Sequence, residues 1–184
     1  MKKILLTLLL FSSIFAQANR ILTLAPTAQV SSIGNVMLPM MNPARNLFDK
    51  DHFSFSRVNW MTNIVNDMSY NFINVDRGPY GINIMFFNYG EQNLTNESGI
   101  IESQFTPLSA VYGFSYARKV SKYNLGLDVK LITHDLHTQK ATGLVLGVGG
   151  YFPKIYKDLD LDVMVRNFGF APKFGDWKSE LPTS

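Results

Sequence analysis

The stretch from Val111 to Thr133 constrains the fold most, because two kinds of residue alternate along two arms around a short polar turn. One side of the arms is aromatic or aliphatic and the other is small or charged: Tyr112, Phe114, Tyr116, Leu125, Leu127, Val129 and Leu131 against Gly113, Ser115, Ala117, Gly126, Asp128 and Lys130. A period of two residues predicts β-strands with one apolar face. Each arm has about ten residues, the length of a tilted strand that crosses a bilayer. A soluble sheet alternates in the same way, so the rest of the chain must decide between water and lipid.

Five further segments alternate similarly: 53–60, 67–75, 81–89, 141–151 and 159–167. Together with the two arms they predict an all-β chain of about seven strands. Short turns are predicted at 76–79, 121–124 and 152–158, and longer polar connections at 90–106 and 134–140. The first of these connections has room for a short hairpin around 96–99. Short turns on one side and longer loops on the other are typical of outer-membrane barrels, although a soluble β-sandwich can alternate too.

The segment 1–18 predicts a cleaved secretory signal peptide. Two lysines precede an apolar run, Ile4 to Phe15, that is too short to span a membrane as a helix. Ala16-Gln17-Ala18 supplies a cleavage site of small residues. The alternative is a retained anchor. The chain has no cysteine, which excludes a lipoprotein, disulfides and thiolate metal sites.

Residues 19–50 show no sustained period and carry several prolines, so we expect an irregular or short-helical segment there. Within it, Asn42-Pro43-Ala44 predicts the start of a helix, with Asn42 as the N-cap and Pro43 at the first helical position. The segment 51–184 then carries the strands.

Charged residues lie on the non-apolar faces of two predicted strands: Asp128, Lys130, Asp160, Asp162 and Arg166. Mixed charges on an inward face can pair across a lumen, whereas they would be costly against lipid. The alternative is the solvated face of a soluble sheet. Gly, Ser and Asn line other polar faces, which predicts that something packs closely over them.

No catalytic, cofactor or metal site is predicted. His134 and His137, with Asp135 between them, are metal-ligand types, but side chains of a strand end point apart. Asp160 and Asp162 share a face, and we expect them to join Arg166 and Lys130 in a salt network, not to act as a catalytic pair. No basic cluster suits nucleic acid, and the formal charge of +3 includes Lys2 and Lys3 of the signal peptide.

A series of motifs along the chain resembles the PorV/PorQ family of outer-membrane proteins, and is nearer to the PorQ branch. They are Asn42-Pro43-Ala44, Trp60, Tyr89-Gly90, Phe105-Thr106, Tyr116-Ala117, Gly126-Leu127-Asp128-Val129-Lys130, Asn167-Phe168-Gly169 and Leu181-Pro182. The family is similar in fold to the fatty-acid transporter FadL, whose plug also carries an Asn-Pro-Ala motif.

The resemblance implies an antiparallel transmembrane β-barrel of FadL-like type, of about fourteen strands. It also implies that residues 19–50 form a small plug and that Asn42, Pro43 and Ala44 lie in it. About half of the strands are predicted here, so we expect the sequence to be truncated after Ser184.

The function implied is that of a non-enzymatic outer-membrane component of type IX secretion, which handles or anchors cargo with C-terminal sorting domains. Its expected partners are outer-membrane lipid, other secretion-system proteins and the cargo, with no cofactor and no nucleic acid. A FadL-like passage for hydrophobic small molecules is the alternative on the same barrel. A soluble periplasmic or surface β-sandwich is a third possibility.

The two strand faces give one expectation about mutations. Leu127→Arg and Val129→Arg should impair assembly more than Gly126→Ser. An Arg at the bilayer midplane costs about 2–4 kcal/mol, whereas a Ser facing a lumen needs only room.

Overall fold

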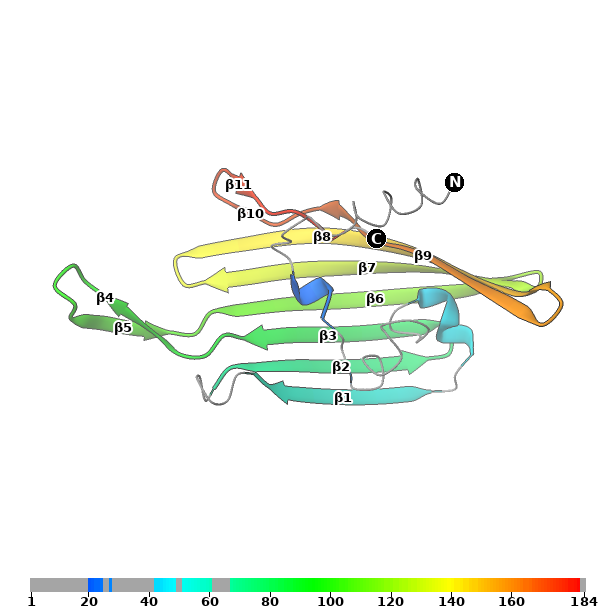
Figure 1. Ribbon diagram of the computed structural model, residues 1–184, viewed down its shortest axis with the longest axis horizontal. Coiled ribbons are helices and arrows are strands. Elements are labelled where there is room, and N and C mark those ends of the chain that lie inside the picture. The colour runs from blue at the N-terminus through cyan, green and yellow to red at the C-terminus, as the bar shows by residue number, and fades with distance from the viewer. Residues whose placement is uncertain (1–19, 25–26, 28–41, 49–50, 61–66, 183–184) are drawn as a thin grey trace, which may run out of the picture.

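The computed structural model describes residues 20–24, 27, 42–48, 51–60 and 67–182 (Figure 1). The predicted signal peptide and most of the predicted plug region lie outside these residues. The elements are two 3-10 helices and eleven strands: η1 Arg20–Leu22, η2 Pro43–Leu47, β1 His52–Asn59, β2 Ser69–Arg77, β3 Tyr80–Asn88, β4 Gln92–Thr95, β5 Ile101–Phe105, β6 Leu108–Val120, β7 Tyr123–Leu136, β8 Gln139–Tyr156, β9 Leu159–Phe170, β10 Lys173–Phe174 and β11 Trp177–Lys178. No helix in this described part is long and apolar enough to cross a membrane.

Seven strands form one antiparallel sheet in the order β1-β2-β3-β6-β7-β8-β9 (Figure 1). Each strand pairs with its neighbours in the chain, except that the separate β4–β5 hairpin is inserted between β3 and β6. β1 and β9 are the two edges of this sheet. The all-β prediction is therefore confirmed, and all seven predicted strands are present.

Two predicted connections are shorter than expected. The loop predicted at 134–140 reduces to His137-Thr138, because β7 and β8 remain paired to Leu136 and Gln139. The turn predicted at 152–158 is wrong in extent, since β8 continues to Tyr156 and pairs irregularly with β9 beyond Phe152. Pro153 lies in this irregular part, where a residue without an N–H is tolerated.

The three turns at one end of the sheet contain two residues each: Gly78-Pro79, Ser121-Lys122 and Lys157-Asp158. Gly78 has φ +56° at the first central position, as a type II′ hairpin turn requires. We call the end of the sheet that carries these three turns the turn end. The opposite end carries the β4–β5 hairpin, which projects beyond the sheet (Figure 1).

The sheet has a covered face, on which η1 and η2 lie, and an open face (Figure 1). Every strand of this sheet places apolar side chains on the open face, and these remain exposed: Phe53, Phe55, Val75, Ile82, Tyr112, Phe114, Tyr116, Leu125, Leu127, Leu131, Leu144, Val148, Leu161, Val163 and Val165. The predicted alternation of the central hairpin is confirmed.

The covered face divides into an apolar half and a polar half. The apolar half packs with η1 into the hydrophobic core, whose buried members are Ile21, Leu22, Tyr70, Phe72, Met85, Phe87, Val111, Ile132 and Val145. The polar half lies nearer the turn end and is made of glycines and hydrogen-bonding side chains. η2 lies over this second half.

The chain after β9 returns toward the sheet. Ser179 N and Oγ both donate to the Pro172 carbonyl, at 3.1 and 2.8 Å, which closes the loop that carries β10 and β11. Asn167 Nδ2 then donates to the carbonyl of Pro182 at 3.2 Å. A Cβ on Gly143 would meet Pro172, so this loop lies against the covered face.

Neighbouring residues on β7 test the two faces. Ile132 is fully buried on the covered face, and Leu131 is 41% exposed on the open face. We expect Ile132→Ala to lower the free energy of unfolding by about 2–5 kcal/mol because it leaves a cavity. Leu131→Ala should lower it by about 1 kcal/mol or less. Denaturant unfolding of both variants in detergent measures this, and equal losses would contradict the assignment of the faces.

Candidate functional site

η2 begins as its sequence predicts. The Asn42 side chain accepts a hydrogen bond from the backbone N–H of Ala44 at 3.0 Å, and Pro43 occupies the first helical position. Asn42, Pro43 and Ala44 are all buried. The interpretation of this motif as a helix start is confirmed, with a 3-10 helix in place of an α-helix. Whether the segment is the plug of a barrel stays a prediction.

Two glycines let η2 approach the sheet closely. A Cβ on Gly126 would lie 2.3 Å from the backbone N of Ala44 and 2.4 Å from the carbonyl carbon of Pro43. A Cβ on Gly149, the residue opposite Gly126 on β8, would lie 1.9 Å from Asn42 Oδ1. The space above these glycines is therefore filled by η2, as the glycine-lined faces predict.

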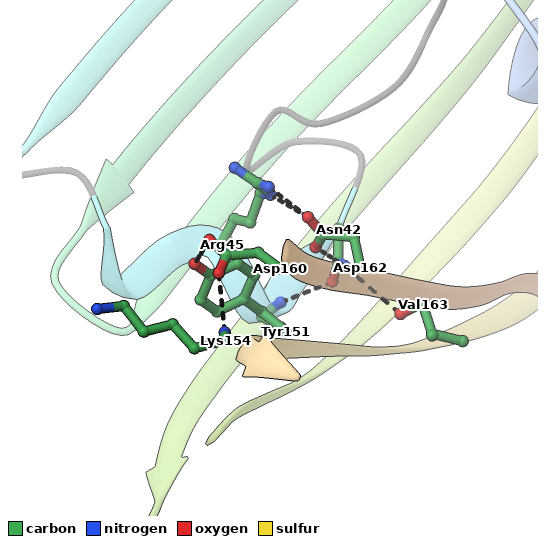
Figure 2. Close-up of polar contacts among 8 residues, drawn as sticks. Asn42, Arg45, Tyr151, Lys154, Asp160, Asp162 and Val163 are labelled. Atoms are coloured by element: carbon green, nitrogen blue, oxygen red, sulfur yellow. Dashed lines mark hydrogen bonds and ion pairs between the residues drawn. The ribbon is translucent and has the colours of Figure 1, made fainter. Parts of the chain in front are cut away.

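Asp162 of β9 binds η2 from the side (Figure 2). Its Oδ1 accepts from Asn42 Nδ2 at 2.9 Å, and its Oδ2 accepts from Arg45 Nε at 3.0 Å. Arg45 Nη2 contacts the same Oδ2 and completes the ion pair. The carboxylate thus fixes both the N-cap and the first turn of η2 to an edge strand of the sheet.

Aromatic rings surround Arg45 beside this ion pair. Its guanidinium lies 5.5 Å from the centre of the Phe48 ring and 5.4 Å from that of Tyr151. The two rings meet edge to face at 4.5 Å. The Tyr151 hydroxyl donates to Asp160, which also accepts from the backbone N–H of Lys154 at 2.9 Å (Figure 2). These contacts link β8, β9 and the segment that carries η2.

A second polar group lies deeper on the covered face. Lys130 Nζ lies 2.5 Å from Asp128 Oδ2, and both side chains are buried beside glycines of the adjacent strands. Asn46 of η2 donates to Ser115 Oγ at 2.8 Å. A Cβ on Gly147 would overlap Asp128 Oδ1, so the carboxylate lies directly over this glycine.

The predicted charged residues are therefore real participants, but their partners differ from those expected. Asp128 pairs with Lys130 on its own strand, and Asp162 pairs with Arg45. Asp160 binds Tyr151. Arg166 lies beside the irregularity where β9 shifts register against β8. Arg45 was not predicted, because it lies in a segment without periodicity. Its one signal in the sequence is its place three residues after the N-cap.

The other candidate ligands are used elsewhere. His134 Nδ1 lies 2.6 Å from Ser109 Oγ on the covered face, and Asp135 pairs with Lys140 at 2.7 Å. The His137 ring lies 4.7 Å from that of Phe105. Among the residues that the structure describes, no three His, Cys, Asp or Glu side chains are placed to hold a metal ion. What the site does chemically is bind one segment of the chain to the sheet.

No protein-family model matches this chain, and no curated protein matches it. Its function must therefore be argued from its own residues and geometry.

One premise of the mutational expectation is wrong, namely that a Ser at position 126 would have room, while the expected ranking of the three variants stays a prediction. Gly126 does face away from the open face, but the room for a Ser side chain is taken by the backbone of η2. We expect Gly126→Ala to lower the free energy of unfolding by about 1–3 kcal/mol, because backbone must move. Gly149→Ala should cost about 1 kcal/mol, since it displaces the Asn42 side chain and its hydrogen bonds but no backbone. Unfolding in detergent compares the two variants. If Gly126→Ala lowered the free energy of unfolding less than Gly149→Ala does, the close approach of η2 to the sheet would be contradicted.

The ion pair between Arg45 and Asp162 is tested by a double-mutant cycle with Arg45→Gln and Asp162→Asn. We expect a coupling free energy of about 0.5–3 kcal/mol, because the pair is largely buried and bound on two sides. The matched control is the exposed pair Lys140 and Asp135, with Lys140→Gln and Asp135→Asn. Its coupling should be about 0.5 kcal/mol or less. Equal couplings would mean that Asp162 does not fix η2.

Proposed function

We propose that the chain is a non-enzymatic outer-membrane β-barrel component of the type IX secretion system, which handles or anchors cargo with C-terminal sorting domains at the cell surface. The observation that carries the membrane part is the open face. On all seven strands of the main sheet this face presents exposed apolar side chains. A sheet that faces water on one side presents polar residues there.

The covered face also supports the proposal that the chain is part of a membrane barrel. It holds buried charges and polar side chains, which are costly against lipid and suit the inside of a barrel. The sheet has two-residue turns at one end and a projecting hairpin at the other. Outer-membrane barrels likewise have short periplasmic turns and longer extracellular loops. The part that concerns type IX secretion is supported by the order of motifs that resembles the PorV/PorQ family.

A pair of leucines tests membrane assembly. Leu127 lies on the open face and Leu94 lies on the β4–β5 hairpin, and they are 46% and 38% exposed. Leu127→Arg should reduce the amount assembled in the outer membrane, because an Arg at the bilayer midplane costs about 2–4 kcal/mol. Leu94→Arg, the matched control, should leave assembly unchanged. Equal recovery of both variants, or the unaltered chain in the soluble periplasmic fraction, would contradict the membrane assignment.

The same variants test the secretion role in a strain that lacks the gene for this chain. Cargo with a C-terminal sorting domain should fail to reach the cell surface, and the unaltered gene or Leu94→Arg should restore it. Leu127→Arg should not. If the cargo is displayed normally while uptake of long-chain fatty acids falls, the FadL-like passage replaces the secretion role.

A further inference from the structure

A groove of about 530 Å³ lies along the open face of β8 and β9. Its walls are apolar: Leu125, Val148, Phe152, Ile155, Leu161 and Val163 are among its lining residues. Phe152 lies over Gly150, where a Cβ would be 2.7 Å from its ring, and so forms part of the floor. The volume falls within the range of about 300–1,000 Å³ that is usual for sites that bind small ligands.

Cations gather where the groove reaches the turn end. Lys122 Nζ lies 5.4 Å from the centre of the Tyr123 ring, and Tyr123 lies 5.3 Å from Phe152 of the groove. Lys157 Nζ lies 5.4 Å from the Tyr156 ring, next to Ile155 of the groove. Arg118, Lys119 and Lys154 are exposed in the same two hairpin ends. Tyr123 thus lies between an apolar wall and an ammonium group.

Two of the three acidic groups near these hairpins are bound by other residues. Asp158 is exposed in the β8–β9 turn, beside Lys157. Asp160 is bound by Tyr151 and by the backbone of Lys154, and Asp162 is bound by Arg45 and Asn42. Residues 117–127 contain three basic side chains and no acidic one: Arg118, Lys119 and Lys122.

We infer that this groove binds an anionic phospholipid, with an acyl chain along the apolar wall and the phosphate at Lys122 and Lys157. The inference rests on the membrane location under the proposed function. An apolar slot that ends in tyrosines and then lysines matches a lipid from chain to headgroup, because aromatic rings favour the interface and cations bind anionic headgroups. A free phosphate would leave the apolar slot unused.

The test is native mass spectrometry of the full chain in neutral detergent, with phosphatidylglycerol or phosphatidylcholine of identical acyl chains. The unaltered chain should retain more phosphatidylglycerol. Each lysine near an anionic headgroup contributes about a fivefold preference. Lys122→Gln with Lys157→Gln should therefore lower the preference by about 25-fold, and Lys122→Arg with Lys157→Arg should keep it. Lys140→Gln, at the opposite end of the sheet, is the matched control and should bind like the unaltered chain.

A bulky substitution separates the acyl chain from the headgroup. Val163→Trp fills the groove, so it should lower the retention of both lipids by the same factor. Equal retention of the two lipids by the unaltered chain, a preference that the double Gln variant leaves unchanged, or a second copy of the chain in place of lipid would each overturn the inference. Partition of the unaltered chain into vesicles is measured separately, so a failure of the proposed membrane location is distinguishable from a failure of the groove.

Discussion

The polar half of the covered face depends on the contact between the backbone of η2 and Gly126. No side chain separates the two backbones there, since a Cβ on this glycine would overlap both Pro43 and Ala44. A helix that lies so close brings its own polar groups against the sheet, and these need partners because burial without a hydrogen bond is costly. Asp162 and Ser115 supply partners for side chains of η2. Gly126 and Gly149 on the one hand, and the polar residues that bind η2 on the other, are thus two consequences of one close approach.

The two faces of the sheet differ in what they bury: the covered face buries charged side chains, whereas the open face leaves apolar side chains exposed. The covered face buries two ion pairs, and each charge is compensated by a partner close at hand. The open face leaves aromatic and aliphatic side chains exposed over seven strands, a larger apolar surface than soluble monomers ordinarily present. Only an apolar environment removes that surface from contact with water. This contrast is the physical basis for preferring a membrane strand array to a soluble sandwich, whose outer faces would be polar.

The sequence predicted the main sheet well because each of its strands has one covered face and one open face, so burial imposes a period of two. β4 and β5 lack such a period, since the hairpin is exposed on both sides and nothing there demands alternation. The pair of Asp128 and Lys130 follows from a spacing of two on one strand. Asp162 and Arg45 are 117 residues apart, and no local pattern reveals a partner at that distance. The face of Gly126 was predictable, whereas the lack of room above it depends on a helix elsewhere in the chain.

The distribution of apolar space bears on which of the two barrel functions the chain suits. Passage of a hydrophobic molecule through a barrel needs an apolar route along the inside. On the covered face, the apolar half is occupied by Ile21 and Leu22, and the polar half is occupied by η2 with its ion pair. The groove along β8 and β9 lies on the opposite, open face, which faces the bilayer under the proposed function. Under the proposed function, the apolar groove lies outside and the bound polar segment lies inside. This arrangement suits a protein that stays in the membrane and presents its projecting hairpin better than one that conducts a solute. We therefore favour the secretion role.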